Sequence, residues 1–240
     1  MNLHRGSRNE CPFCGFKSNG WAITGIDVPV LKERQVIGAG RRNAACYQCD
    51  SDDRERLVYL FLKDYLNLFD DTDLKRSILH IAPEPNLEKK ISRLDHEYIC
   101  GDLFEAGYEY PEYVLNMDVQ KLPFEEGSFD LIICNHVLEH VENDHQAMSE
   151  LYRVLRPSGK AILQVPISEN IQLTLEDSSI QNPDERTKLF GQSDHVRLYG
   201  KDYVNRLEKN GFKVNQINIS RNYPEYGLNP KEDIFLGEKL

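Results

Sequence analysis

The stretch "ILHIAPEPNLEKKI" at residues 78–91 joins a short apolar run to an amphipathic segment through a turn that holds two prolines. It therefore predicts a strand, a tight turn and a helix. Related units recur along the chain. Strands are expected at 77–81, 97–101, 113–117, 129–134 and 160–165, and helices from about Leu87 and at 144–155. Apolar strands that alternate with amphipathic helices predict a parallel sheet covered by helices on both faces.

The chain on either side of this core follows other patterns. A helix near 201–209 stops at Asn210-Gly211, and "FKVNQINIS" and "DIFLGEK" then predict two strands that pair antiparallel. Before the core, "DRERLVYLFLKDYLNLF" has one apolar stripe and predicts a helix that leads into the sheet. The expected fold class is α/β, with a doubly wound, seven-stranded, mostly parallel sheet and an antiparallel C-terminal strand pair.

Two C-x-x-C pairs stand near the start of the chain, "CPFCG" and "CYQC". Two thiolates at this spacing reach one metal ion from a tight turn, and two such turns complete a tetrahedral four-sulfur shell. Residues 1–53 are therefore predicted to form a zinc-ribbon-like domain ahead of a second domain at 54–240. The predicted ligands are Cys11, Cys14, Cys46 and Cys49. Iron in this shell stays open as an alternative, whereas a reducing cytoplasm disfavours disulfides.

The segment between the two cysteine pairs is thirty-one residues long, more than most such sites have. Its apolar residues predict an extended hairpin inside the ribbon. The residues expected in that hairpin are Trp21, Ile23, Val28, Val30 and Leu31.

Composition and charge narrow the classes of function. The 240 residues are 40% hydrophobic and carry a net charge of −10, which disfavours broad adhesion to nucleic acid or anionic membrane. Residues 1–50 have a net charge of +3, so this segment is free to touch an anionic partner. No apolar run is long enough to span a membrane, and "MNLHRGSRNE" lacks the apolar centre of a secretory signal. The expected location is the cytoplasm.

In a sheet of this type the ligand lies beyond the carboxyl ends of the strands, at the switch point beside the first strand. The residues there belong to "NMDVQKLPFEEGSFDLIICNHVLEHV" at 116–141, which "ELYRVLRPSGKAILQVP" follows at 150–166. This series, with its acidic residue before "LPF", its "FD" strand, its "LEHV" and its "RVLRPSG", resembles the class I S-adenosylmethionine-dependent methyltransferases. The resemblance covers roughly residues 77–240.

The resemblance implies roles for individual residues. Asp102 is expected to hold the ribose hydroxyls of S-adenosylmethionine, since a carboxylate can accept both hydroxyl hydrogens. Asp118 is expected to meet the exocyclic amine of the adenine, and Val119 to pack on its ring. Asn135 and His136 are expected to line the methionine portion and the acceptor pocket. The alternative for each aspartate is a turn or helix cap.

The first loop departs from the family pattern, which has an acidic residue followed by glycines at alternate positions. Here His80 replaces the acidic residue and Ala82 replaces the first glycine. Pro83 and Pro85 are expected to stiffen the turn. Glu84 either pairs with the amino group of the cofactor or is solvated or caps the following helix near Asn86, and both options stay open.

Methyl transfer from a sulfonium needs an acceptor held in line with the methyl group and often a base. The predicted catalytic residues are His136 and His195. His195 falls in a polar segment at 168–200 that is expected to shape the acceptor pocket. "HVLEH" also matches an inverted zinc-protease motif, which the context disfavours. In similar ubiquinone-pathway enzymes acidic residues near this helix hold a divalent cation, but His136 departs from that pattern.

The function predicted by the resemblance is methyl transfer from S-adenosylmethionine to an unidentified acceptor, in a protein that also binds zinc. The acidic second domain and the lack of an Asn-Pro-Pro-aromatic signature favour an oxygen of a small molecule or glycan. One alternative is an RNA base methyltransferase whose ribbon meets RNA. Its phosphate contacts would be Lys32, Arg34, Arg41 and Arg42. Another alternative is a non-catalytic, zinc-dependent scaffold with a methyltransferase fold.

Overall fold

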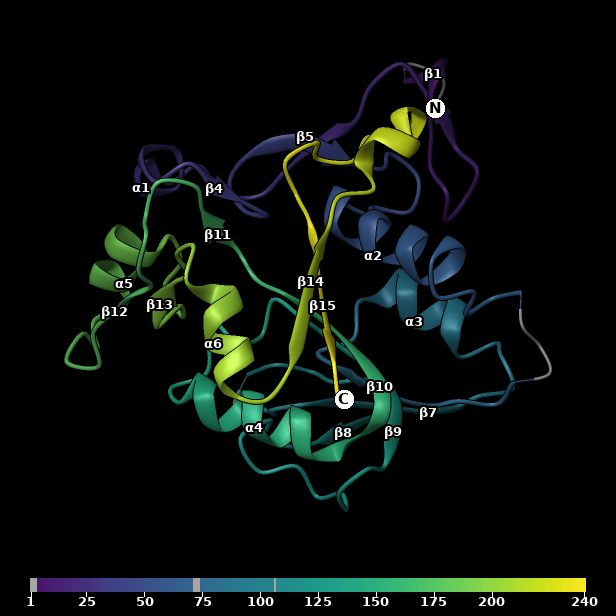
Figure 1. The fold of residues 1–240 in the computed structure, drawn as a ribbon. Helices are drawn as coiled ribbons and strands as arrows, with labels where there is room; N and C mark the ends of the chain where they lie inside the picture. The colour runs from purple at the N-terminus through teal and green to yellow at the C-terminus, as the bar shows by residue number, and fades with distance from the viewer. Residues whose placement is uncertain (1–3, 71–73, 106) are drawn as a thin grey trace.

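A central seven-stranded sheet organises the computed structural model, which describes residues 4–70, 74–105 and 107–240 (Figure 1). The strand order is β14-β15-β10-β9-β6-β7-β8. β15 runs antiparallel to both its neighbours, and the other pairs are parallel. The strands are β6 Ser77–Ile81, β7 Glu97–Asp102, β8 Val114–Asn116, β9 Phe129–Asn135, β10 Leu155–Gln164, β14 Lys213–Ile217 and β15 Ile234–Glu238. The predicted fold class is confirmed.

Helices cover both faces of this sheet because successive strand residues point to opposite sides. Leu79 and Ile132 pack in one buried cluster with Leu151 of α4. The neighbouring Ile78 and Ile133 pack in a second cluster with helices of the other face. That face carries α2 Asp53–Asp64 and α3 Pro85–Ile91, and the first face carries α4 Asp144–Val154 and α6 Tyr203–Lys209 (Figure 1).

Two boundaries differ from those expected. α2 ends at Asp64, because Asn67 adopts a left-handed φ of 49° and turns the chain while Leu68 still packs in the core. β10 begins at Leu155, earlier than predicted, and its pairing with β9 shifts register between Leu155 and Lys160. An irregularity of this kind lets "RPSG" continue the strand despite its proline.

The N-terminal segment contains short strands around the two cysteine pairs. β1 Arg5–Glu10 pairs with β2 Lys17–Ser18, and β3 Ala22–Thr24 pairs with β5 Arg42–Ala45. The predicted hairpin is wrong beyond these arms. Pro29 starts the short helix α1 Pro29–Glu33, a position that suits the fixed φ of proline, and Val30 and Leu31 are buried. Residues 1–3 of the predicted 1–53 domain lie outside the described residues.

The N-terminal segment packs against the polar segment at 168–200 and against the loop between β14 and β15, residues 218–233, which we call the C-terminal loop. β4 Val36–Ile37 pairs with β11 Ile167–Ser168, and α1 lies beside α5 Pro183–Phe190, as Figure 1 shows. Within the polar segment β12 Leu175–Glu176 pairs with β13 Arg197–Leu198. The cysteine-bearing segment is therefore packed against the α/β core, and the division at residue 53 stays a prediction.

Buried Arg56 at the start of α2 holds the C-terminal loop against the N-terminal segment. Its guanidinium donates to the carbonyls of Ser51, Tyr226 and Gly227, and it lies 3.8 Å from the ring centre of Trp21. The loop contains the short 3₁₀ helices η1 Ser220–Asn222 and η2 Pro224–Tyr226. Among the described residues no helix is both long and apolar enough to cross a membrane.

Candidate functional site

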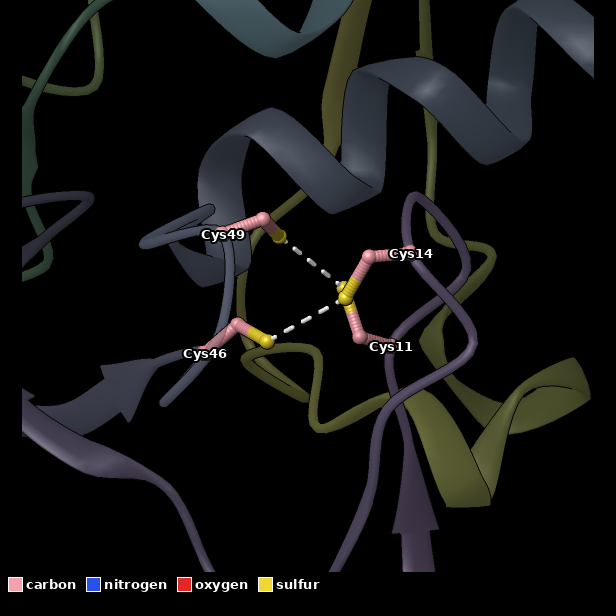
Figure 2. A group of neighbouring side chains, drawn as sticks. All are labelled: Cys11, Cys14, Cys46 and Cys49. Atoms are coloured by element: carbon pink, nitrogen blue, oxygen red, sulfur yellow. Dashed lines mark hydrogen bonds between the residues drawn. The ribbon is translucent and has the colours of Figure 1, made fainter. Parts of the chain in front are cut away.

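The four predicted ligands of the ribbon converge on one point, as Figure 2 shows. The Sγ atoms of Cys11 and Cys49 are 3.5 Å apart, and those of Cys14 and Cys46 are 3.7 Å apart. Four thiolates about 2.3 Å from one ion stand about 3.8 Å from each other, whereas a disulfide needs about 2.05 Å. The cluster therefore fits a tetrahedral metal ion and not two disulfides.

Matching turns produce this convergence. The amide of Gly15 donates to the carbonyl of Cys11, and the amide of Asp50 donates to the carbonyl of Cys46. Both Gly15 and Asp50 adopt left-handed φ values, 71° and 60°, which close each turn tightly. The Oγ of Ser51 lies 3.3 Å from the Sγ of Cys11, so a hydroxyl supports the sulfur shell.

The second candidate site is the switch point of the sheet, between the carboxyl ends of β6 and β9. Ala82 and His136, the residues that follow these two strands, both have left-handed φ values, 49° and 55°. Non-glycine residues adopt this conformation at a cost, and such residues gather at functional sites. Ala82 takes the conformation that a glycine adopts freely, and its amide donates to the carbonyl of Gly101. The glycine-free loop thus keeps a glycine-like turn.

Glu84 ties the two sides of this switch point together. Its Oε2 lies 2.7 Å from Nε2 of His80, and its Oε1 accepts from Nδ2 of Asn135 at 3.0 Å. His80 is fully buried, and its Nδ1 lies 2.8 Å from the hydroxyl of Tyr98. Any contact of His80 with a ligand therefore acts through Glu84, which remains partly exposed.

Capping of the following helix, one of the options for Glu84, is carried out by another residue. Glu84 makes no side-chain cap, and Oε1 of Glu55 instead accepts from the amides of Asn86 and Leu87 at 2.8 and 3.1 Å. Burial raises the pKa of Glu55 to about 7. Glu55 was not predictable as the cap, because it lies 31 residues before Asn86 and no local motif links the two.

The two aspartates predicted to hold the nucleoside stand at successive strand ends. Asp102 closes β7, and its Oδ1 accepts from the amide of Leu103 at 2.8 Å. Burial raises the pKa of Asp102. Oδ1 of Asp118 accepts from the amide of Gln120 at 2.8 Å, and the adjacent Val119 is buried. Both carboxylates make turn contacts of the kind given above as the alternative, and their roles toward a cofactor stay predictions.

Beside the switch point lies a group of polar side chains with buried, unpaired atoms, which we call the polar cluster: Asn135, His136, Glu139 and Glu232. Among the residues that the structure describes, every buried side-chain nitrogen or oxygen without a hydrogen bond belongs to these four residues. Oε2 of Glu139 and Oε2 of Glu232 are two of them. Nδ1 of His136 stands 3.4 Å from Oε1 of Glu139, an ion-pair distance without hydrogen-bond geometry.

The N-terminal segment reaches this polar cluster. A Cβ placed on Gly38 would lie 3.2 Å from Oε1 of Glu232 and 3.5 Å from Cε1 of His136. Arg54 donates to the carbonyl of Gly38 at 2.9 Å and holds that loop in place. Burial, and then the nearby charge of Arg54, lower the pKa of His136. Neither Gly38 nor Glu232 was expected at the site, because each lies far from residue 136 in sequence.

Burial raises the pKa of Glu232 from its ordinary 4.5 to about 8, which makes a testable difference to stability. Because the folded state binds this proton more tightly than the unfolded state, the stability it contributes is full below pH 4.5 and is lost as pH rises to 8. Glu232→Gln should remove that loss. Between pH 5 and 8 the variant should gain about 1.4 kcal/mol over the wild type per pH unit.

Chemical denaturation at several pH values measures this difference. Glu225→Gln is the matched control, since Glu225 is exposed in the same C-terminal loop. If the free energy of unfolding changed with pH in the same way in the wild type and in Glu232→Gln, the raised pKa of this buried carboxyl would be contradicted.

The polar segment places His195 beside the residues that follow β9. The ring of His195 packs edge-on against that of His140 with centroids 4.7 Å apart, and its Nδ1 lies 3.3 Å from the carbonyl of Phe190. Nδ1 of His140 lies 3.2 Å from a carboxylate oxygen of Asp194. His195 is 5% exposed, so it is a packed residue and not a solvated loop histidine.

Residues 81–163 match the model of a methyltransferase domain. The chain is 35% identical to a 37.1 kDa protein of transposon TN4556 from Streptomyces fradiae over 100 residues. This match covers 42% of the chain and 25% of the relative. The chain is also 37% identical to the sterol 4-C-methyltransferase strm-1 of Caenorhabditis elegans over 57 residues. This match covers 24% of the chain and 17% of the relative. The chain thus spans a quarter or less of these curated relatives.

Among solved structures, the fold resembles a SAM-dependent methyltransferase from Archaeoglobus fulgidus, with a TM-score of 0.51 and 16% identity over 76% of this chain and 93% of that one. At this identity the likeness concerns the fold. The strand order, the switch point between β6 and β9 and the matched segment agree with it. The sheet therefore has the class I fold, and residues 81–163 within it are similar to a methyltransferase domain.

Proposed function

We propose that the protein transfers a methyl group from S-adenosylmethionine to an acceptor bound at the polar cluster. The observation that carries this proposal is the gathering of unpaired, buried polar atoms beside the switch point of a methyltransferase domain. A buried polar group without a partner costs about 1–3 kcal/mol. A protein that keeps several such groups in one place gains most when a ligand pairs with them.

The cofactor would lie across the carboxyl ends of β6, β7 and β9. Asp102 would accept from the ribose hydroxyls, and Asp118 and Val119 would hold the adenine. Glu84 has both oxygens engaged inside the protein, but its side chain is 26% exposed and a carboxylate offers about four acceptor positions. It therefore retains the capacity to pair with the amino group of the cofactor. The turn at Ala82 would supply the close backbone approach.

The cofactor supplies an electrophilic methyl group on a sulfonium, and the chain supplies orientation and proton transfer. Glu232, with a pKa of about 8, suits proton exchange with an acceptor near neutral pH. Burial lowers the pKa of His136, and the neutral imidazole can accept a proton at the ring nitrogen that carries none. His195 packs against His140, and its Nδ1 faces the carbonyl of Phe190, so it offers fewer unpaired atoms to an acceptor. His136 and Glu232 are therefore the stronger candidates for a base.

The acceptor that these groups favour is a hydroxyl of a small molecule or glycan. Carboxylates and an imidazole both orient a hydroxyl and take its proton. The name of the C. elegans relative assigns a carbon acceptor to that protein, and the short match to it leaves the acceptor of this chain open. An RNA acceptor is less favoured, because Arg42 is paired with buried Asp53 and Lys32 with Asp27.

We further propose that the four-cysteine cluster binds zinc and that the zinc holds the ribbon over the acceptor. The support is the tetrahedral spacing of the sulfurs together with the contact of Gly38 with the polar cluster. Closing a site in this way excludes water from the reacting groups. The ribbon would then select the acceptor and leave cofactor binding to the sheet.

Two measurements test the proposed function. S-adenosylmethionine titrated into zinc-loaded protein should bind with micromolar affinity, and turnover against a library of hydroxylated metabolites should yield S-adenosylhomocysteine. His136→Ala and Glu232→Gln should lower turnover at least about 100-fold while cofactor affinity changes little. The absence of cofactor binding by folded, zinc-loaded protein would contradict the proposal.

A further inference from the structure

The residues after β9 and the end of the polar segment form a second group of metal-binding side chains outside the cysteines. One ligand atom each of Glu139, His140 and His195 lie within 4.8 Å of one another. A tetrahedral ion with bonds of about 2.1 Å needs about 3.4 Å between ligands, so these atoms would move closer together on binding. We propose that these three residues bind a divalent transition-metal ion.

The Nδ1 partners of the two histidines, one an ion pair and one a hydrogen bond, support this assignment. A histidine that binds a metal through one ring nitrogen usually donates the other N–H to a carboxylate or a backbone carbonyl. Nδ1 of His140 faces the carboxylate of Asp194 at 3.2 Å, and Nδ1 of His195 faces the carbonyl of Phe190 at 3.3 Å. These contacts favour the tautomer in which Nδ1 carries the proton and Nε2 is left to bind an ion.

The third proposed ligand, Glu139, has a carboxylate oxygen that is free to bind an ion. The side chain of Glu139 is 2% exposed, and its Oε2 has no hydrogen-bond partner. A buried carboxylate oxygen without a partner is costly, and a cation removes the cost. His140 is 31% exposed on its side chain, which gives an ion a path from solvent to the other two ligands.

The backbone holds the ligands together although they come from distant parts of the chain. The amide of Val196 donates to the carbonyl of Glu139 at 2.9 Å. Buried Arg197 donates to the carbonyls of Leu138 and Glu142 at 2.6 and 2.9 Å. The polar segment is therefore fastened to the residues after β9 on both sides of the group, which pre-organises the site.

Two imidazoles and a carboxylate suit zinc and its neighbours in the transition series, and three protein ligands leave a fourth position open. Glu139 also belongs to the polar cluster, so an ion here would reach that group. If the proposed methyl transfer holds, the ion would polarise the acceptor hydroxyl and lower its pKa. Metal binding itself does not depend on that reaction.

The test counts metal ions by mass spectrometry after equilibrium dialysis of the full chain against micromolar zinc. The wild type should hold two ions per chain, His195→Ala and Glu139→Gln one, and His145→Ala two. His145 is the matched control because it is an exposed histidine outside the group. A wild type with one ion, or equal counts in His195→Ala and His145→Ala, would overturn the proposal.

A second variant separates ligand loss from misfolding. Asp194→Asn keeps all three ligands but weakens the support of His140, so it should bind the second ion about 10- to 100-fold more weakly and reach two ions at saturation. Cobalt provides an independent readout, since cobalt in the four-cysteine cluster shows intense sulfur charge-transfer bands that a nitrogen and oxygen site lacks. If the second cobalt ion adds sulfur bands, the assignment to Glu139, His140 and His195 is wrong.

Discussion

Cys46→Ser should lose the metal ion of the four-cysteine cluster and unfold the N-terminal segment. Cys46 is 2% exposed, and a structural zinc ion contributes about 10–16 kcal/mol in small zinc domains. A hydroxyl does not replace a thiolate in such a shell, and the short strands β1 to β5 have little core of their own. Mass spectrometry should show one ion fewer per chain, and limited proteolysis should cleave residues 4–50.

The same variant tests the role of the ribbon at the active site. Because Gly38 and Arg54 reach the polar cluster, turnover should fall at least about 100-fold, while S-adenosylmethionine affinity should change by less than about 5-fold. Cys100→Ser is the control, since Cys100 is a buried thiol in β7 outside the cluster. Full metal content and turnover in Cys46→Ser would contradict both the zinc site and the role of the ribbon.

Asp102→Ala should weaken binding of S-adenosylmethionine about 100-fold. The carboxylate is expected to accept two hydroxyl hydrogens, and each hydrogen bond to a charged group contributes about 1.5 kcal/mol or more. Two such bonds amount to about 3 kcal/mol, which corresponds to the stated factor. Isothermal titration calorimetry of the zinc-loaded protein measures the change directly.

Two controls accompany this experiment. Asp95→Ala removes an exposed aspartate that pairs with Lys75 far from the strand end, and it should bind the cofactor as the wild type does. A thermal melt of Asp102→Ala checks the loss of the turn contact with the amide of Leu103. Equal affinity in a folded Asp102→Ala protein would remove Asp102 from the cofactor site and with it the main link to the family pattern.

The order of elements could be predicted from the sequence because it rests on local patterns. Strands β6 to β9 and helices α3 and α4 were expected within a few residues of their observed bounds, since apolar runs and amphipathic periods are readable over short windows. The metal-binding turns were equally local, because two cysteines three residues apart share one turn. Helix α1 was missed, although Pro29 marks its first turn, because its apolar residues were assigned to a strand.

The residues that complete the candidate sites were not predictable in this way. Glu55 caps a helix that begins thirty residues later, and Glu232 joins a polar cluster whose other members lie between 135 and 139. His195 was singled out as a histidine in a polar segment, but its neighbour His140 and its partner Phe190 were not expected. Each of these contacts depends on how the chain between two distant residues folds back on the core.

By itself, the sequence determined the α/β sheet, the four cysteines that face one another, and the strand ends where a cofactor would lie. Only the tertiary structure decided that Gly38 lies beside the polar cluster, that Glu84 joins His80 to Asn135, and that His195 lies near Glu139. The physical reason is the range of the forces involved. Periodicity and turn chemistry act between near neighbours in the chain, whereas buried polar groups find partners that packing brings from distant segments.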